Sequence, residues 1–119
     1  MTHKKLIIAV DFDGTIVEHR YPEIGKKIPY SFEVLKQLQA EGHYLILWTY
    51  RAGKYLEEAM NFCKKNGLVF YAVNENEPNE EFHNYMSRKI YADIYIDDKN
   101  IGGLIDWIKI KEIIDNYDL

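Results

Sequence analysis

The feature that most constrains the fold of this chain is a set of four short apolar runs, at residues 6–10, 44–48, 68–73 and 94–96. Each run is nearly continuous and is bounded by polar residues. A strand with one wet face alternates polar and apolar residues, whereas a strand covered on both faces reads as an unbroken run. The four runs therefore predict a parallel sheet.

Helical periodicity separates these runs. Three stripes of apolar residues recur at helical spacing, and a glycine follows each of the first two as a stop signal. The stripes are Val34, Leu35 and Leu38 before Gly42; Leu56, Ala59, Met60 and Cys63 before Gly67; and Leu104, Trp107, Ile108 and Ile114. This alternation predicts an α/β fold, a three-layer Rossmann-like open parallel sheet with helices on both faces. No repeat or linker divides residues 1–119, so we expect a single domain.

Polar side chains stand where the apolar runs end, which is where open α/β sheets bind their ligands. They are Asp11-Phe12-Asp13-Gly14-Thr15 after the first run, Thr49 and Arg51 after the second, and Asp97-Asp98 after the last, with Lys89 shortly upstream of it. The carboxyl ends of parallel strands meet at one edge of the sheet. Four carboxylates are therefore expected to converge there.

Four converging carboxylates require a compensating charge. Two of them about 4 Å apart repel by roughly 4 kcal/mol at an effective dielectric near 20. We expect Mg²⁺, because it takes oxygen ligands from a few carboxylates and completes its shell with water and phosphate. Asp11 and Asp13 project to the same side of the strand end, so one can attack phosphorus while the other protonates the leaving group and activates water. Gly14 permits a sharp turn, and the Thr15 hydroxyl can tie the loop.

In this order and conjunction, the motifs resemble those of the haloacid dehalogenase superfamily. The motifs are an apolar strand before Asp11-Phe12-Asp13-Gly14-Thr15, a second before Thr49, then Lys89, and a further strand before Asp97-Asp98. The aspartate at position 13 favours phosphatase over dehalogenase chemistry, because dehalogenation has no need of that acid. The resemblance implies a magnesium-dependent phosphomonoester hydrolase that acts through an aspartyl-phosphate intermediate.

The resemblance also implies a catalytic role for four residues. Asp11 would form the aspartyl-phosphate and ligate Mg²⁺. Asp13 would be the general acid/base and would lend the metal its backbone carbonyl. Thr49 would hydrogen-bond the phosphoryl oxygens, and Lys89 would neutralise charge on the nucleophile and the phosphate. Arg88 is the neighbouring alternative to Lys89.

The remaining motif residues are expected to complete the metal and substrate sites. Asp97 would ligate the metal, and Asp98 would ligate it directly or through water. Gly14, Thr15 and Arg51 are expected to bind substrate. For Arg51 a structural ion pair is an equally strong alternative.

The spacing of the motifs leaves no room for a large cap domain. Residues 16–29 can form only a short flap, and residues 71–88 only a strand end and a loop. Superfamily members without a cap have open sites that accept large substrates, or close them by oligomerisation. The resemblance therefore implies a phosphorylated small molecule or macromolecule as substrate, and it leaves a homo-oligomer open.

Composition argues against several other functions. The formal net charge is −4 and the pI is near 5.5, which disfavours a surface for nucleic acid or for anionic membranes. Cys63 is the single cysteine, so an intrachain disulfide is excluded, and its place on an apolar stripe predicts a buried, unreactive thiol. Nothing in the sequence resembles a secretory signal or a membrane span, so we expect a cytoplasmic protein.

Two other functional classes compete with the phosphatase. A signalling receiver domain also gathers aspartates, a threonine and a lysine on a parallel sheet, but there the acid pair comes early in the chain and here it comes last. A non-catalytic domain of the same fold would bind phosphate or metal without turnover. Steady release of phosphate distinguishes the enzyme from both.

Overall fold

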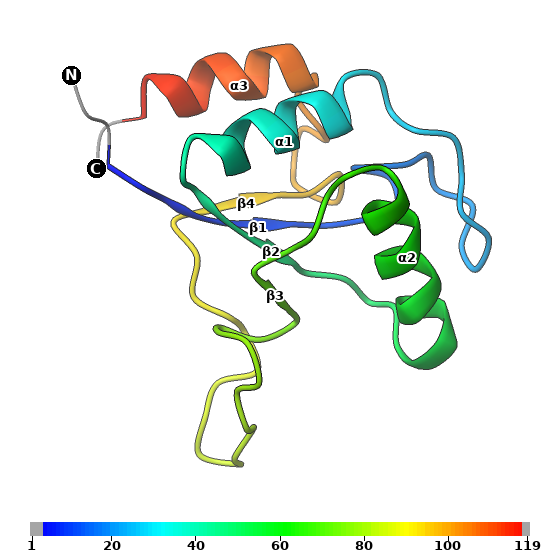
Figure 1. Ribbon diagram of the computed structural model, residues 1–119, viewed down its shortest axis with the longest axis vertical. Coiled ribbons are helices and arrows are strands. Elements are labelled where there is room, and N and C mark those ends of the chain that lie inside the picture. The colour runs from blue at the N-terminus through cyan, green and yellow to red at the C-terminus, as the bar shows by residue number, and fades with distance from the viewer. Residues whose placement is uncertain (1–3, 118–119) are drawn as a thin grey trace.

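The structure is a computed structural model that describes residues 4–117. Its elements follow one another as β1 (Ile7–Val10), α1 (Ser31–Ala40), β2 (Tyr44–Leu47), α2 (Gly53–Lys65), β3 (Ala72–Val73), β4 (Ile94–Ile96) and α3 (Trp107–Asp115) (Figure 1). All pairings are parallel, and the strand order is β3-β2-β1-β4. The predicted parallel sheet is confirmed, although the run at 68–73 forms a strand only at its last two residues.

The expectation of helices on both faces of the sheet is wrong for the described residues, because all three helices pack into one cluster on one face. Successive right-handed crossovers from β1 to β2 to β3 step in the same direction, which puts α1 and α2 on the same side. The return connection from β3 to β4 passes the other face, and residues 74–93 contain no helix. Ile90 of this connection packs instead against Ala9 and Ile46.

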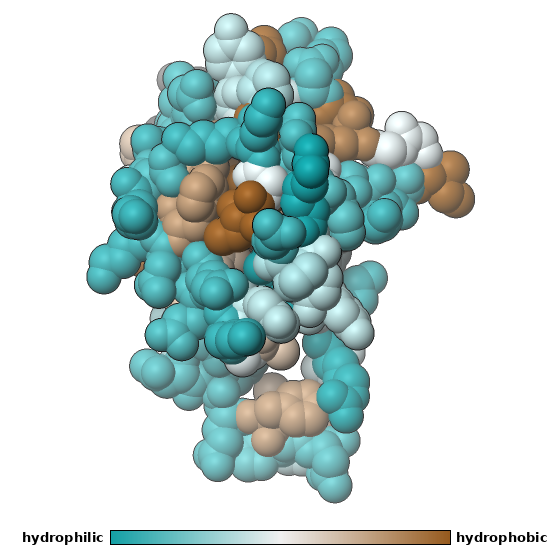
Figure 2. Space-filling model, turned by 90° about the vertical axis from the view of Figure 1, so that its right-hand side faces the viewer, coloured by the Kyte–Doolittle hydropathy of each residue, from teal (hydrophilic) through white to brown (hydrophobic). Residues whose placement is uncertain are grey.

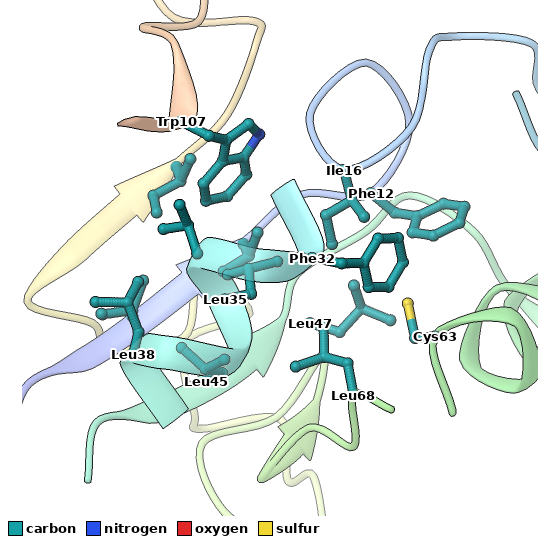
Figure 3. Packing of buried hydrophobic residues seen from close by; sticks show 14 of the residues in the cluster. Phe12, Ile16, Phe32, Leu35, Leu38, Leu45, Leu47, Cys63, Leu68 and Trp107 are labelled. Atoms are coloured by element: carbon teal, nitrogen blue, oxygen red, sulfur yellow. The ribbon is translucent and has the colours of Figure 1, made fainter. Parts of the chain in front are cut away.

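The larger core lies between the sheet and the helices (Figure 3). It joins the strand residues Ile8, Val10, Leu45 and Leu47 to Leu35 and Leu38 of α1, Cys63 of α2 and Trp107 of α3. Two residues predicted on the apolar stripes lie outside this core: Met60 is 41% exposed and Ile108 is 53% exposed. The buried side of α3 is instead completed by Ile110.

The predicted helix ends are confirmed by their hydrogen bonds. After α1, the Gly42 amide donates to the Gln39 carbonyl and the His43 amide donates to the Leu38 carbonyl; α2 ends in the same way at Gly67. This is the Schellman pattern, which satisfies the last carbonyls of a helix. The start of α3 is capped by Asp106, whose side chain accepts from the Lys109 amide. No helix in residues 4–117 has both the length and the apolar character needed to span a bilayer.

Two irregular segments lie beside the sheet, one at its carboxyl edge and one on the face that carries no helix. Residues 16–29, the predicted flap, fold back on themselves through backbone hydrogen bonds from Glu18 to Lys26 and from Ile28 to Ile16. Residues 74–93 project away from the sheet at the bottom of Figure 1. Figure 2 shows an apolar patch on the same projecting region. Phe82, which belongs to this segment of the chain, is 52% exposed.

Candidate functional site

The candidate site forms where the strand order reverses. The chain moves from β1 toward β2 on one side, and β4 pairs with β1 on the other, so a crevice opens beyond the ends of β1 and β4. The Asp11 amide donates to the Ile96 carbonyl at 3.0 Å, which brings the ends of the two strands level. Asp11, Asp97 and Asp98 each place a carboxylate oxygen there, and these oxygens lie within 4.8 Å of one another. The convergence of these three acids is confirmed.

Thr15 ties the loop after β1 to the loop after β4. Its hydroxyl donates to Asp11 Oδ2 at 3.0 Å and accepts from the Asp98 amide at 3.0 Å. Its carbonyl accepts from Trp107 Nε1 at 2.9 Å. The predicted loop-tying hydroxyl is confirmed. Because the whole residue is buried, the Thr15 side chain is placed to hold the carboxylates rather than to face a substrate.

Gly14 allows Asp98 to approach the backbone of the first loop. Its φ is +86°, in the left-handed region that favours glycine. A Cβ at this position would lie 2.2 Å from Asp98 Oδ2. Gly14 therefore shapes the site by leaving room for a carboxylate, and no larger residue fits without moving it.

Burial, the hydrogen bond with Asp98 and the charge of Asp97 together raise the pKa of Asp11 to about 8, against the opposing hydrogen bond from Thr15. Asp97 and Asp98 thus disfavour the ionised form of Asp11. A bound cation would reverse this effect. The ligand set consists of oxygens only, which fits a hard divalent cation.

Asp13 does not join the three clustered carboxylates but pairs with Arg51. Arg51 Nε donates to Asp13 Oδ2 at 2.7 Å, and Nη2 donates to Oδ1 at 2.7 Å. The Arg51 side chain is fully buried and that of Asp13 is 10% exposed. This two-pronged geometry fixes the plane and the position of the Asp13 carboxylate.

The remaining donors of Arg51 are also engaged by the protein. Nη1 donates to the carbonyls of Pro22 and Tyr55, and Nη2 donates to the carbonyl of Glu23. A guanidinium has five N–H groups, and these contacts use all of them. The geometry therefore favours the structural ion pair over direct substrate binding by Arg51.

A cleft of about 570 Å³ opens over the carboxylates. Its lining combines predicted site residues with side chains from the flap, from the end of β2 and from the loop after β4. The full set is Asp11, Asp13, His19, Tyr21, Trp48, Thr49, Tyr50, Asp97, Asp98 and Lys99. A smaller cavity of about 290 Å³ lies beside β4 and α3, but most of its lining is aliphatic. The larger cleft is the candidate site because Asp11, Asp97 and Asp98 all line it.

Thr49 lines this cleft at the end of β2, as predicted. Its hydroxyl accepts from the Arg51 amide at 3.1 Å, and its amide donates to Asn74 Oδ1 at 2.8 Å. Asn74 was not predicted, although it directly follows the third apolar run. It holds the Thr49 backbone in place and so supports the site from the loop directly after β3.

Lys89, the predicted catalytic cation, does not line the cleft. It is exposed, and its Nζ lies 5.1 Å from the centre of the Tyr95 ring. Arg88 lies over the ring of Phe82. Lys99 is the lysine that lines the cleft. Sequence reasoning missed it, although its position directly after Asp97-Asp98 was a usable signal.

Flap residues also contribute more to the cleft than the sequence indicated. His19 and Tyr21 lie in the flap at 16–29, and both line the cleft. The Tyr21 ring contacts Tyr50 edge-on, with 6.3 Å between the ring centres. Tyr50 itself is 92% exposed, so the mouth of the cleft is partly aromatic.

Comparison with known proteins identifies a relative but no activity. No family model and no curated protein matches the chain. The chain is similar to a solved structure of a conserved protein from Bacteroides thetaiotaomicron, with 52% sequence identity and a TM-score of 0.91, over 98% of this chain and 94% of that one. Identity at this level over nearly the full length of both chains shows common ancestry. The chain belongs to the same family as that conserved protein.

Proposed function

We propose that this protein is a magnesium-dependent phosphomonoester hydrolase that forms an aspartyl-phosphate on Asp11. The observation that carries the proposal is the gathering of Asp11, Asp97 and Asp98 within 4.8 Å at the floor of a cleft. Asp13 and Thr49 line the same cleft, so a nucleophile, an acid and a phosphate-binding hydroxyl share it with the carboxylates.

The proposed reaction has two displacements at phosphorus. The Asp11 carboxylate attacks, the bond from phosphorus to the leaving-group oxygen breaks, and that oxygen takes the proton of Asp13. Asp13, now ionised, takes a proton from water, and the water oxygen attacks phosphorus. The bond to Asp11 then breaks, which releases inorganic phosphate and restores both aspartates.

The carboxylates supply the ligands that this reaction needs. Mg²⁺ held by Asp11, Asp97 and the Asp13 carbonyl, with Asp98 bound directly or through water, would keep Asp11 ionised and neutralise charge on the phosphoryl oxygens. Thr15 holds Asp11 and the backbone of Asp98 in place for this ligand set. The Thr49 hydroxyl, which accepts from the Arg51 amide, keeps its own proton to donate to a phosphoryl oxygen.

Membership of the haloacid dehalogenase superfamily, without a large cap, is part of the same proposal. The motif order supports it, and the four parallel strands put the three motif carboxylates at one switch point. The connections that could carry a cap are the flap at 16–29 and the irregular segment at 74–93. A cleft with an open mouth suits a phosphorylated small molecule or an exposed phosphate on a macromolecule.

The test is phosphate release from p-nitrophenyl phosphate and a panel of phosphomonoesters, with and without Mg²⁺. Asp11→Asn removes the nucleophile with almost no change in volume, so we expect release that requires Mg²⁺ and disappears in this variant. Asp115→Asn makes the same change on α3, at a residue that does not line the cleft, and should keep the rate. Retention of most of the rate by Asp11→Asn would exclude the covalent step.

Two further readouts separate the alternatives. A stable, stoichiometric phosphoprotein with slow loss of phosphate would indicate a receiver-like domain, and metal binding without turnover on any ester would indicate a non-catalytic one. Lys89→Ala and Lys99→Ala are compared on the same substrates. Loss with Lys89→Ala alone supports the role that the resemblance implies, and loss with Lys99→Ala alone assigns the cation to the lysine that lines the cleft.

A further inference from the structure

We propose that Arg51 is a positioning residue that fixes the Asp13 carboxylate for leaving-group protonation and joins it to the flap at 16–29. This inference rests on the proposed phosphatase function, because it assigns Asp13 the role of acid. It concerns a residue that does not touch the substrate and acts through another side chain. Three observations support it: the Arg51 guanidinium is buried, it is hydrogen-bonded to Asp13, and it also contacts the flap.

The ion pair between Arg51 and Asp13 is buried and has a specific geometry. Two hydrogen bonds of 2.7 Å join the guanidinium to both oxygens of the carboxylate. The Arg51 side chain is fully buried, so the solvent does not compete for these donors. Only a planar fork can hold both oxygens at once, and a lysine ammonium cannot reproduce it.

The other side of the guanidinium binds the flap. Nη1 donates to the Pro22 carbonyl at 3.0 Å, and Nη2 donates to the Glu23 carbonyl at 2.9 Å. The guanidinium carbon also lies 5.2 Å from the centre of the Tyr21 ring. Because Tyr21 lines the cleft, one buried cation sets the position of both the acid and a wall of the site.

Two further contacts keep the guanidinium itself from moving. Its carbon lies 5.1 Å from the centre of the ring of Phe12, which is fully buried and precedes Asp13 in the sequence. Nη1 also donates to the Tyr55 carbonyl in α2. Arg51 is thus anchored by the sequence neighbour of Asp13, by a helix and by the flap together.

The consequence for the reaction is selective. Arg51 occupies one lone pair on each oxygen of Asp13, so the proton that Asp13 donates is carried on a lone pair outside this fork. Transfer requires that proton to lie within hydrogen-bond reach of the leaving-group oxygen, so misplacement of Asp13 slows the esters that need a proton. A nitrophenolate leaves without one. A merely structural role for Arg51 would slow both kinds of ester by the same factor.

The experiment compares Arg51→Gln with the unmodified protein on p-nitrophenyl phosphate and on a simple alkyl phosphate. We expect kcat/KM to fall on the order of 100-fold for the alkyl ester and less than about 10-fold for the nitrophenyl ester. Asp13→Asn should show the same pattern, and the double variant should be no worse than Asp13→Asn alone. Arg20→Gln makes the same change at an exposed position of the flap and is the matched control. Equal losses on both esters, or additive losses in the double variant, would overturn the proposal.

Loss of a buried cation can prevent folding, so a second measurement uses the unmodified chain. In the NMR spectrum, the Arg51 Nε–H is expected to exchange slowly with water and to shift in Asp13→Asn. An Nε–H that exchanges freely, or that does not respond to Asp13→Asn, would refute the pairing. If the unmodified protein releases no phosphate from any ester, the proposed function fails, and this NMR result still decides whether Arg51 holds Asp13.

Discussion

Replacement of Gly14 by alanine tests whether the close approach of Asp98 builds the site. The new Cβ would lie 2.2 Å from Asp98 Oδ2 and 2.6 Å from Cγ, far inside ordinary van der Waals contact at 3.4–4 Å. The backbone of the first loop is tied to the rest of the site by Thr15, so the Asp98 carboxylate has to move. A retreat of roughly 1 Å takes it away from Asp11 and from a shared ligand position.

The magnitude has two parts. An alanine at φ +86° is strained, at a cost of about 1–2 kcal/mol. Displacement of Asp98 weakens its hydrogen bonding with Thr15 and the packing around it, at a further cost of about 1–2 kcal/mol. Gly103 isolates the first part, because its φ is +77° and nothing lies within 4 Å of its added Cβ.

Urea unfolding of Gly14→Ala and Gly103→Ala, each with EDTA and with millimolar Mg²⁺, separates these contributions. We expect Gly103→Ala to lose about 1–2 kcal/mol and Gly14→Ala about 2–4 kcal/mol. A ligand at about 100 times its Kd stabilises the folded state by about 2.7 kcal/mol, and this gain should persist in Gly103→Ala and largely vanish in Gly14→Ala. Equal losses in the two variants, with equal gains from Mg²⁺, would refute the structural reasoning.

Three other outcomes follow from the same geometry. Because the pKa of Asp11 is raised to about 8 from its ordinary 3.8, the folded metal-free protein keeps a proton between these pH values that the unfolded chain loses. The free energy of unfolding in EDTA, measured by urea denaturation, should therefore fall as pH rises across this window, by less than about 1 kcal/mol per pH unit for a partly exposed group. Asp11→Asn should remove this pH dependence. Burial raises the pKa of Cys63 to about 12, so a thiol reagent should modify it only in denaturant, as measured by absorbance or mass. Trp107→Phe leaves the Thr15 carbonyl without its donor and should lower the free energy of unfolding in urea by about 1–3 kcal/mol. A loss well below about 1 kcal/mol would show that this hydrogen bond does not support the site.

Sequence alone predicted the parts of the site that depend on strand ends. The near-continuous runs at 6–10 and 94–96 identified two buried parallel strands, and acids at their carboxyl ends had to meet once the strands paired. The glycine stops at Gly42 and Gly67 were predictable for the same reason, since they depend on a few neighbouring residues. Features of this kind can be predicted from sequence because they depend on neighbouring residues rather than on contacts between distant segments.

Contacts that join distant segments were beyond the reach of these signals. The fork between Arg51 and Asp13 depends on where the flap carbonyls lie, and no spacing in the sequence encodes that position. Met60 fits an apolar stripe by periodicity but faces outward, because Ala59 and Cys63 already fill the space against the core. Lys99 reaches the cleft because the chain turns after β4, which an assignment based on order along the chain did not anticipate.

The connection between β3 and β4 explains both the wrong layer prediction and the unpredicted place of Lys89. A helix in this return connection would cover the second face of the sheet. Residues 74–93 are rich in asparagine and glutamate and form no helix, so Ile90 and Ala92 cover that face instead. Lys89 therefore lies on an irregular segment, with its ammonium group over the Tyr95 ring, and no helix or strand positions it toward the cleft. The three carboxylates need no such support, because the pairing of β1 with β4 alone brings them together.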